Sequence, residues 1–256
     1  VWLFVSRQHF VTMLKLAHEI DEKFLDFYLK FDYHKENRRL IISIIAYTAF
    51  SSTLVLTSRL SLDYYQVKIP NSLSYVHFYS FICSMIIIHH LIVGFKGIQI
   101  RFEKLNFYIE QNPHLMGEFL IKKLANLHFD ICLLIKAFNK VYGFIIIISV
   151  TSGFGWFCLF LFMAATGKME NINKFFYLVV IDTFIHVFNC LVFFYIIKTA
   201  ESVKREGKWT KIILYELFNK SEDTRHRDLL HQFIYQIDNS NMEISSELLD
   251  INWKFF

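Results

Sequence analysis

The sequence predicts an all-α polytopic membrane protein. Of its 256 residues, 54% are hydrophobic and 18% are aromatic, and only two are proline. This composition is too apolar and too rich in helix-forming residues for an ordinary soluble domain. The apolar residues gather in runs of about 20, the length that a helix needs to cross a bilayer. Charged segments with helical periodicity separate these runs, so we expect membrane spans with long helical extensions in water.

The first part of the chain contains one complete predicted span. Residues 1–5 indicate the end of a span, and residues 40–62 form an apolar stretch long enough to cross a bilayer. Residues 6–39, between the two, predict an amphipathic helix in water. Its apolar positions recur at alternating steps of three and four residues: Phe10, Met13, Ala17, Ile20, Phe24 and Phe27.

Three more complete spans are predicted at 75–100, 141–165 and 175–198. Residues 101–140 predict helices in water, the first of which continues from the span before it until an Asn-Pro step at 112–113 ends it. The second helix leads directly into the next span. Its apolar stripe consists of Leu120, Leu124, Leu127, Ile131, Leu134, Phe138 and Val141.

The carboxyl-terminal part changes from charged to apolar. Residues 199–243 predict amphipathic helices in water, and residues 244–256 begin an apolar helix. Because the chain begins without a methionine and stops within an apolar run, we expect both ends to be truncated. Glu243, Glu247 and Asp250 follow one another at steps of four and three residues, so a continuous helix places all three near one face.

The positions of Lys and Arg predict the orientation of the chain. Most of them fall in 6–39, 101–140 and 199–243, close to the ends of the predicted spans. The short loops on the opposite side hold Lys68, Lys168 and Lys174. Because basic residues near span ends favour the cytosolic side, we expect the three basic segments in the cytosol. We therefore expect a multi-pass protein located in the plasma membrane, with its amino terminus in the cytosol.

Composition and spacing also argue against several classes of function. The net charge of +4 is small, and no basic patch predicts a nucleic-acid partner. No motif predicts an enzyme, a cofactor or a metal centre. The four cysteines have no CxxC spacing and look like buried small apolar residues. They are Cys83, Cys132, Cys158 and Cys190.

Asp182 is a carboxylate well inside a predicted span, where an ionisable group must face the protein interior or water. His186 follows four residues later on the same helix face, and His89 and His90 lie at similar depth in another span. We interpret these four residues as the floor of an outward-facing ligand pocket. A hydrogen-bonded network between helices, without a ligand, is the open alternative. A metal site is disfavoured because adjacent histidines point about 100° apart on a helix.

Residues nearer the outside of the predicted spans complete the candidate pocket. Aromatic faces can stack on sugar rings or flat alkaloids, and hydroxyls or charged groups can orient the polar groups of a ligand. Besides Asp182 and His186, the candidate ligand contacts are Trp156, Phe81, Tyr177, Thr57, Arg59, Phe78 and Met85, with Thr53 and Phe160 beside them.

Three stretches of the chain resemble the insect gustatory receptors, a family related to the odorant receptors. They are LANLHFDICLLIKAFNKVYG before one span, ESVKREGKW after another, and SELLDINWKFF at the end. The resemblance covers nearly the whole chain, although the family's Thr-Tyr and Gln-Phe ending is absent. It implies seven spans with a cytosolic amino terminus. The first span would be missing, and 1–5 and 244–256 would belong to the second and seventh.

The resemblance further implies a homo- or hetero-tetrameric cation channel, with cytosolic helices that hold the subunits together and last helices that line one pore. Glu243, Glu247 and Asp250 would then form carboxylate rings that attract permeating cations at the pore mouth. A solvent-facing acidic surface is the alternative. We therefore expect a gustatory receptor subunit that forms a ligand-gated, non-selective cation channel, opened by a sugar or a bitter compound.

Two other classes of membrane protein remain as alternatives. A seven-span G-protein-coupled receptor would need the opposite orientation, which the distribution of basic residues opposes. A secondary transporter would usually show paired repeats with helices broken by Gly or Pro, and the sequence shows no such pairing.

Overall fold

The computed structural model of the chain describes residues 2–29, 71–165 and 172–240, together with residues 38, 41–42, 45–46, 49–50, 52–53 and 56. Within these ranges, side chains are described for residues 7–29, 88–114, 116–143 and 194–240, for residues 158 and 191, and for the separate residues between 38 and 56.

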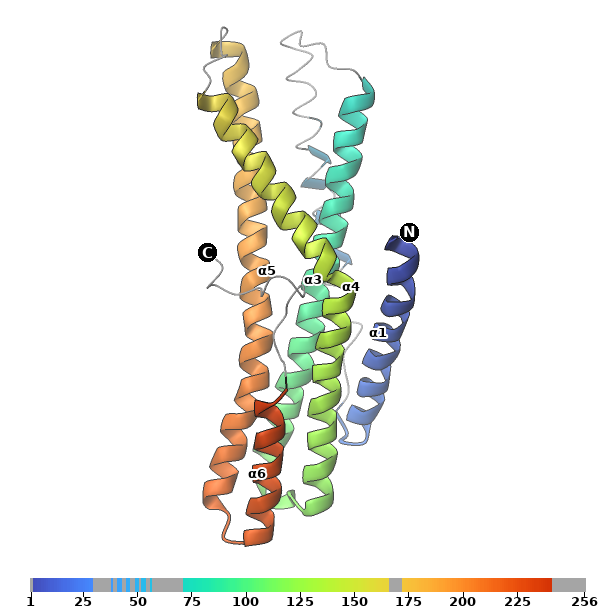
Figure 1. Cartoon of the computed structure of the whole chain (residues 1–256), viewed down its shortest axis with the longest axis vertical. Helices are drawn as coiled ribbons and strands as arrows, with labels where there is room; N and C mark the ends of the chain where they lie inside the picture. The colour runs from blue at the N-terminus through green and yellow to red at the C-terminus, as the bar shows by residue number, and fades with distance from the viewer. Residues whose placement is uncertain are drawn as a thin grey trace. The chain divides into compact units, whose positions relative to one another are not determined.

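The described residues form α-helices and one short 3-10 helix (Figure 1). The elements are α1 (Trp2–Leu25), α3 (Asn71–Gln111), η1 (Pro113–Leu115), α4 (Glu118–Ala165), α5 (Ile172–Lys220) and α6 (Thr224–Asp238). The prediction of an all-α chain is confirmed for this part of the protein. Within the same part, no helix combines the length and the apolar character needed to cross a membrane.

Three helices are far longer than the roughly 20 residues that a bilayer requires. Helices α3, α4 and α5 contain 41, 48 and 49 residues. As predicted, α3 continues to Gln111 and stops at the Asn-Pro step, where Pro113 begins η1. Helix α1 is shorter than the predicted segment 6–39, because it ends at Leu25 and Tyr28 adopts a positive φ of 58°.

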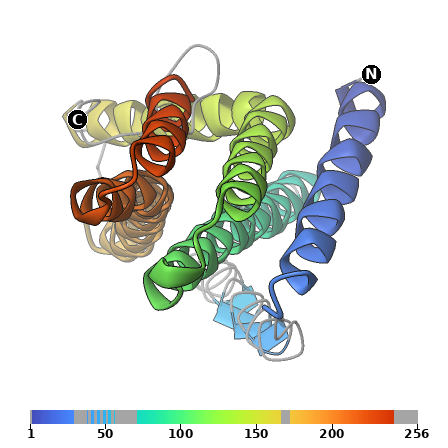
Figure 2. The same ribbon diagram turned by 90° about the horizontal axis from the view of Figure 1, so that it is seen from below.

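Contacts between residues divide the chain into two compact units, which are described separately. The first unit, here called the bundle, comprises residues 1–31, 94–146 and 197–256, and the second comprises 32–93 and 147–196. The bundle contains α1, the end of α3, η1, the beginning of α4, the end of α5, and α6. Figures 1 and 2 show α6 beside α4 and α5 within this bundle.

The apolar faces predicted from periodicity form the core of the bundle. On α1 and the turn after it, the buried residues are Met13, Ile20, Phe24 and Phe27. On α4 they include Leu124, Leu127, Ile131, Leu134, Phe138 and Val141, and on α6 they are Leu230, Phe233, Ile234 and Ile237. Residues three and four apart on a helix share a face, so each helix buries one stripe and leaves the other side to its charged residues.

One close approach between α3 and α4 depends on a glycine. A Cβ atom on Gly94 would overlap the ring of Phe138, so the ring can pack against the backbone of α3 only because no side chain is there. The Phe138 ring also contacts Phe95 and Tyr142, with centroid distances of 4.8 and 4.5 Å. Gly94 therefore fixes how closely α3 and α4 approach.

A break in the helix separates α5 from α6, and its position was not predicted from the sequence. Three residues, 221–223, leave the helix, and Asp223 caps the new one by accepting a hydrogen bond from the backbone N–H of Arg225 at 3.0 Å. An aspartate with extended backbone at this position is a preferred helix N-cap. The cap allows α6 to turn back against the bundle and bury its apolar stripe.

Candidate functional site

Seven of the predicted ligand contacts lie on helices that the structure describes, and they are distributed over α3, α4 and α5. Phe78, Phe81 and Met85 lie on α3, Trp156 on α4, and Tyr177, Asp182 and His186 on α5. All of these positions belong to the second unit. Their side chains lie outside the described residues, as do Thr57, Arg59 and the predicted pore-mouth residues Glu243, Glu247 and Asp250. The pocket and the pore mouth therefore remain predictions.

Two members of the predicted polar cluster have described side chains. His89 is buried, with 6% of its surface exposed, whereas its neighbour His90 is exposed. This difference fits the expectation that adjacent helix residues point in different directions. The cysteines also differ, because Cys132 is buried as predicted and Cys158 is exposed. The interpretation of Cys158 as a buried residue was wrong, since a helix position can be apolar in sequence without facing other side chains.

A buried polar contact joins α3 to α5 in the bundle. The Asn106 side chain donates to the backbone oxygen of Glu206 at 2.9 Å and accepts from the Thr210 hydroxyl at 2.6 Å. Asn106 is 3% exposed and Thr210 is fully buried. A buried amide that loses these partners would be costly, so the pair favours one register between the two helices. The signal in the sequence was an asparagine on the apolar stripe of α3, between Phe102 and Ile109.

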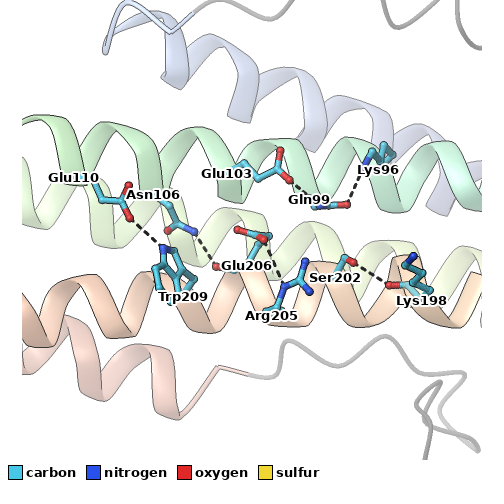
Figure 3. A network of polar contacts seen from close by, with 10 residues as sticks. All are labelled: Lys96, Gln99, Glu103, Asn106, Glu110, Lys198, Ser202, Arg205, Glu206 and Trp209. Atoms are coloured by element: carbon cyan, nitrogen blue, oxygen red, sulfur yellow. Dashed lines mark hydrogen bonds and ion pairs between the residues drawn. The ribbon is translucent and has the colours of Figure 1, made fainter.

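Further polar contacts continue along the same two helices (Figure 3). Toward the end of α3, the indole N–H of Trp209 donates to Glu110 at 3.0 Å. In the other direction, Lys96 contacts Gln99 at 3.3 Å, and Gln99 donates to Glu103 at 2.6 Å. Of these polar contacts, those of Asn106 and Glu110 therefore join α3 to α5, whereas the contacts of Gln99 lie within α3.

Ion pairs attach α1 to α3 and α4. Asp21 of α1 pairs with Arg101 of α3 at 2.6 Å, and the two side chains are only 13% and 10% exposed. Lys23 pairs with Asp130 of α4 at 2.6 Å. Asp26, just after α1, pairs with Lys123 at 2.7 Å. Arg101 also donates to the backbone oxygen of Gly97 at 2.8 Å, which orients its guanidinium toward α1.

His128 is fully buried where α3, α4 and α6 meet. Its ring lies 5.3 Å from the Phe102 ring and 5.8 Å from the Phe233 ring, centroid to centroid. Burial lowers the pKa of His128 to about 4, and the Gly207 backbone offsets only part of this effect. The imidazole is therefore neutral near pH 7. Sequence reasoning missed this residue because the buried face was assigned to apolar residues alone.

Cys132 lies one turn beyond His128, with its Sγ atom 3.7 Å from Nδ1 of the imidazole. Burial raises the pKa of Cys132 to about 11, against the opposing effects of Ser240 and Lys136. Both groups are uncharged at neutral pH, so the thiol and the imidazole share one weak hydrogen bond and the thiol is a poor nucleophile. Among the residues with described side chains, no group of three or more His, Cys, Asp or Glu could hold a metal ion.

A cavity of about 320 Å³ opens between α4 and α6. Phe129, Cys132, Leu133 and Lys136 line it from α4, and Tyr235, Gln236, Asn239 and Ser240 line it from α6 and the residues that follow. Gln236 also donates to the backbone oxygen of Ala125 at 3.0 Å, which fixes this part of α6 against α4. No carboxylate is among the residues that line the cavity.

Comparison with known proteins places the chain in a family. The model of a family described as 7tm chemosensory receptor matches residues 1–256, the whole chain. No curated protein matches the chain. The family match agrees with the three stretches that resemble gustatory receptors. The family comprises multi-pass membrane receptors for small-molecule ligands and not enzymes. The chain therefore belongs to the 7tm chemosensory receptor family, that of the insect gustatory receptors.

Proposed function

We propose that the chain is a subunit of a ligand-gated, non-selective cation channel that a small tastant opens, either a sugar or a bitter compound. The observation that carries this proposal is the family match over residues 1–256. The long helices support it, since α3, α4 and α5 each continue from a predicted span into a bundle with its own core. A bundle of this kind can connect subunits as well as spans.

Exposed apolar side chains on the bundle support contacts with other subunits, which we propose form a homo- or hetero-tetramer. On α5, Trp209, Ile212 and Tyr215 are 44%, 46% and 42% exposed, and on α3 Phe107 is 56% exposed. Large aromatic side chains in contact with water often mark a protein interface, where they contribute most of the binding energy. We propose that these residues face another subunit.

The pore mouth is proposed to follow α6. Four buried apolar residues hold α6 against the bundle, and the chain continues from it to Glu243, Glu247 and Asp250. If subunits surround one axis, each carboxylate on the axial face becomes a ring that attracts cations. Of the three, Asp250 is the leading candidate because it lies closest to the apolar run that follows.

The ligand is proposed to bind among the candidate contacts of the second unit, with Asp182 and Trp156 as the leading residues. A charge-assisted hydrogen bond between Asp182 and a hydroxyl or cationic group would contribute about 1.5 to 3 kcal/mol. Asp182→Asn should then shift the agonist dose response by about tenfold at normal surface expression. An unchanged dose response at normal expression would remove Asp182 from the pocket.

Excised membrane patches test channel function most directly. With the full-length receptor expressed alone, agonist-evoked cation current should persist in patches without nucleotides, because a channel subunit needs no G protein. At low salt, where screening is weakest, Glu247→Gln and Asp250→Asn should lower the unitary conductance and raise relative anion permeability. Glu216→Gln, at an exposed position on α5, is the matched control and should change neither. Loss of the current on removing nucleotides would favour a G-protein-coupled receptor instead.

A further inference from the structure

The cavity between α4 and α6 has room for a small ring compound. Its volume is about 320 Å³, and a cavity of about 150 Å³ already holds one benzene ring. A molecule of one or two rings therefore fits within it. Of the residues that line the cavity, Cys132 alone is buried, so it lies deepest and the mouth opens to solvent.

Two exposed aromatic side chains line the cavity, one from each helix. Phe129 belongs to α4 and Tyr235 to α6. Leu133, one turn after Phe129, adds a half-buried apolar side chain. Aromatic side chains that line a concave surface are typical of ligand sites. Rings also pair with other rings more favourably than the buried area alone explains. The lining therefore favours a flat aromatic ligand over an aliphatic chain.

The charge of the lining is positive and comes from one residue, Lys136. It is exposed and forms no ion pair with any residue whose side chain is described. Its charge acts within the cavity, because it opposes the rise in the pKa of the buried Cys132 thiol, one turn earlier on α4. Side chains of a helix lean toward its amino-terminal end, so the ammonium group extends back toward Cys132 and Leu133. The positive charge and the apolar side chains therefore share one small volume.

The neutral polar residues that follow Tyr235 in the lining are already engaged with the backbone. Their side chains donate hydrogen bonds to backbone oxygens: Gln236 to Ala125, Asn239 to Tyr235 and Ser240 to Ile237. Lys136 is therefore the strongest donor that the lining offers to a ligand. Because no carboxylate lines the cavity, a ligand with a single negative charge complements it.

We propose that the cavity between α4 and α6 binds a small aromatic carboxylate from the cytosol, with its ring against Phe129 and Tyr235 and its carboxylate at Lys136. The ligand has one or two rings and touches both helices at once. This site is separate from the candidate tastant contacts of the second unit, and its binding does not depend on the proposed channel function. A bound ligand would also link α4 to the segment that leads to the proposed pore, and only that consequence rests on channel function.

Equilibrium dialysis of 2-naphthoate against the purified full-length receptor in detergent tests the proposal, with binding to receptor-free micelles subtracted. A saturable site with a dissociation constant below about 1 mM is expected. The amide 2-naphthamide has the same two rings and no charge. At low salt it should bind about fivefold more weakly, because it lacks the ion pair with an exposed lysine.

Two surface variants separate the charge from the ring contacts. Lys136→Gln should weaken naphthoate about fivefold and leave naphthamide within about twofold of wild type. Its matched control is Lys15→Gln, which removes an exposed lysine of α1 that forms no ion pair with any described side chain. Tyr235→Ala should weaken both compounds about fivefold. Tyr215→Ala, at an exposed tyrosine of α5 outside the cavity, is the control and should weaken neither.

A third variant tests whether the cavity itself is occupied. Leu133→Trp fills it from a half-buried position and should remove the saturable binding of both compounds. Its melting temperature shows whether it folds, and the surface variants decide the matter if it does not. Equal affinity for naphthoate and naphthamide would overturn the proposal, as would unchanged binding by Tyr235→Ala or by a folded Leu133→Trp. No ion current enters this measurement, so failure of the patch experiment would leave its result intact.

Discussion

Helices α1 and α6 are both amphipathic, shorter than α3, α4 and α5, and attached to α4, yet they are attached in different ways. Each contributes four buried apolar residues to the core, counting Phe27 with α1. The ion pair that links α1 to α3, Asp21 with Arg101, is 13% and 10% exposed. The ion pairs of α6 are at the surface, since Asp238 and Arg225 are 49% and 78% exposed.

The comparison shows that similar apolar stripes can be combined with very different electrostatic contacts. A nearly buried ion pair is costly to break, because the remaining charge has little water around it. A surface pair contributes about 0 to 1 kcal/mol and weakens as salt is added. We therefore expect α6 to depend on its apolar residues and its cap, and α1 to depend strongly on one charged pair as well.

The largest effect is expected from Phe233→Ala on α6. The Phe233 side chain is 2% exposed and contacts His128 of α4, so its loss leaves a cavity and should lower the free energy of unfolding by about 4 kcal/mol. Chemical unfolding of the detergent-solubilised full-length receptor measures this change. Tyr235→Ala, on the same helix at 66% exposure, is the control and should cost about 0.5 kcal/mol or less. Similar losses for the two variants would mean that α6 is not held by its apolar stripe.

A somewhat smaller effect is expected from Asp21→Asn on α1. Arg101 is nearly buried, and the substitution removes the negative charge with which it pairs. In the same unfolding measurement, the free energy of unfolding should therefore fall by about 3 kcal/mol. Lys23→Gln, which breaks a pair in which the lysine is 50% exposed, should cost less than about 1 kcal/mol. Replacing both charges, in Asp21→Leu with Arg101→Met, should recover most of the loss. If Asp21→Asn and Lys23→Gln lower the free energy of unfolding equally, the nearly buried ion pair contributes no more to the attachment of α1 than a surface pair does.

The smallest of the three effects is the loss of stability in acid that arises from His128, which is buried against α6. The pKa of His128 is about 4 in the folded protein and near 6.5 in the unfolded chain, so as pH falls below 6.5 the unfolded state takes up a proton that the folded state does not. Well above pH 6.5, His128 is neutral in both states, so its protonation does not contribute to the pH dependence of stability. Between pH 7.5 and pH 5 it should remove about 2 kcal/mol from the free energy of unfolding.

His128→Gln is the variant that isolates this proton, because glutamine does not titrate. The free energy of unfolding should fall less in the variant than in wild type over the same pH change. The difference between the two falls should be about 2 kcal/mol. Carboxylates elsewhere titrate equally in both proteins and cancel in the difference. Equal acid sensitivity of the two proteins would show that His128 becomes protonated within the folded bundle.

Much of the fold could be predicted from local patterns. The steps of three and four residues identified the buried stripes of α1 and α4, because a helix repeats every 3.6 residues whatever it packs against. The Asn-Pro step at 112–113 marked the end of α3, because proline cannot continue a helix. The break before α6 had a local signal as well, Asp223 as an N-cap, although charge and periodicity continue on both sides of it.

The sequence by itself determined the helical class, the long continuous helices and the family, because these depend on local periodicity, composition and a match along the chain. Only the tertiary structure decided which polar groups are buried and which charges are paired. Lys123 and Lys136 are similar lysines on one helix, yet Lys123 pairs with Asp26 and Lys136 makes no ion pair with any described side chain. Likewise, Asn106 and Thr210 are 104 residues apart in the chain and meet at 2.6 Å. The physical reason is that a polar side chain is stabilised by partners from other helices, and these are known only when the helices have packed.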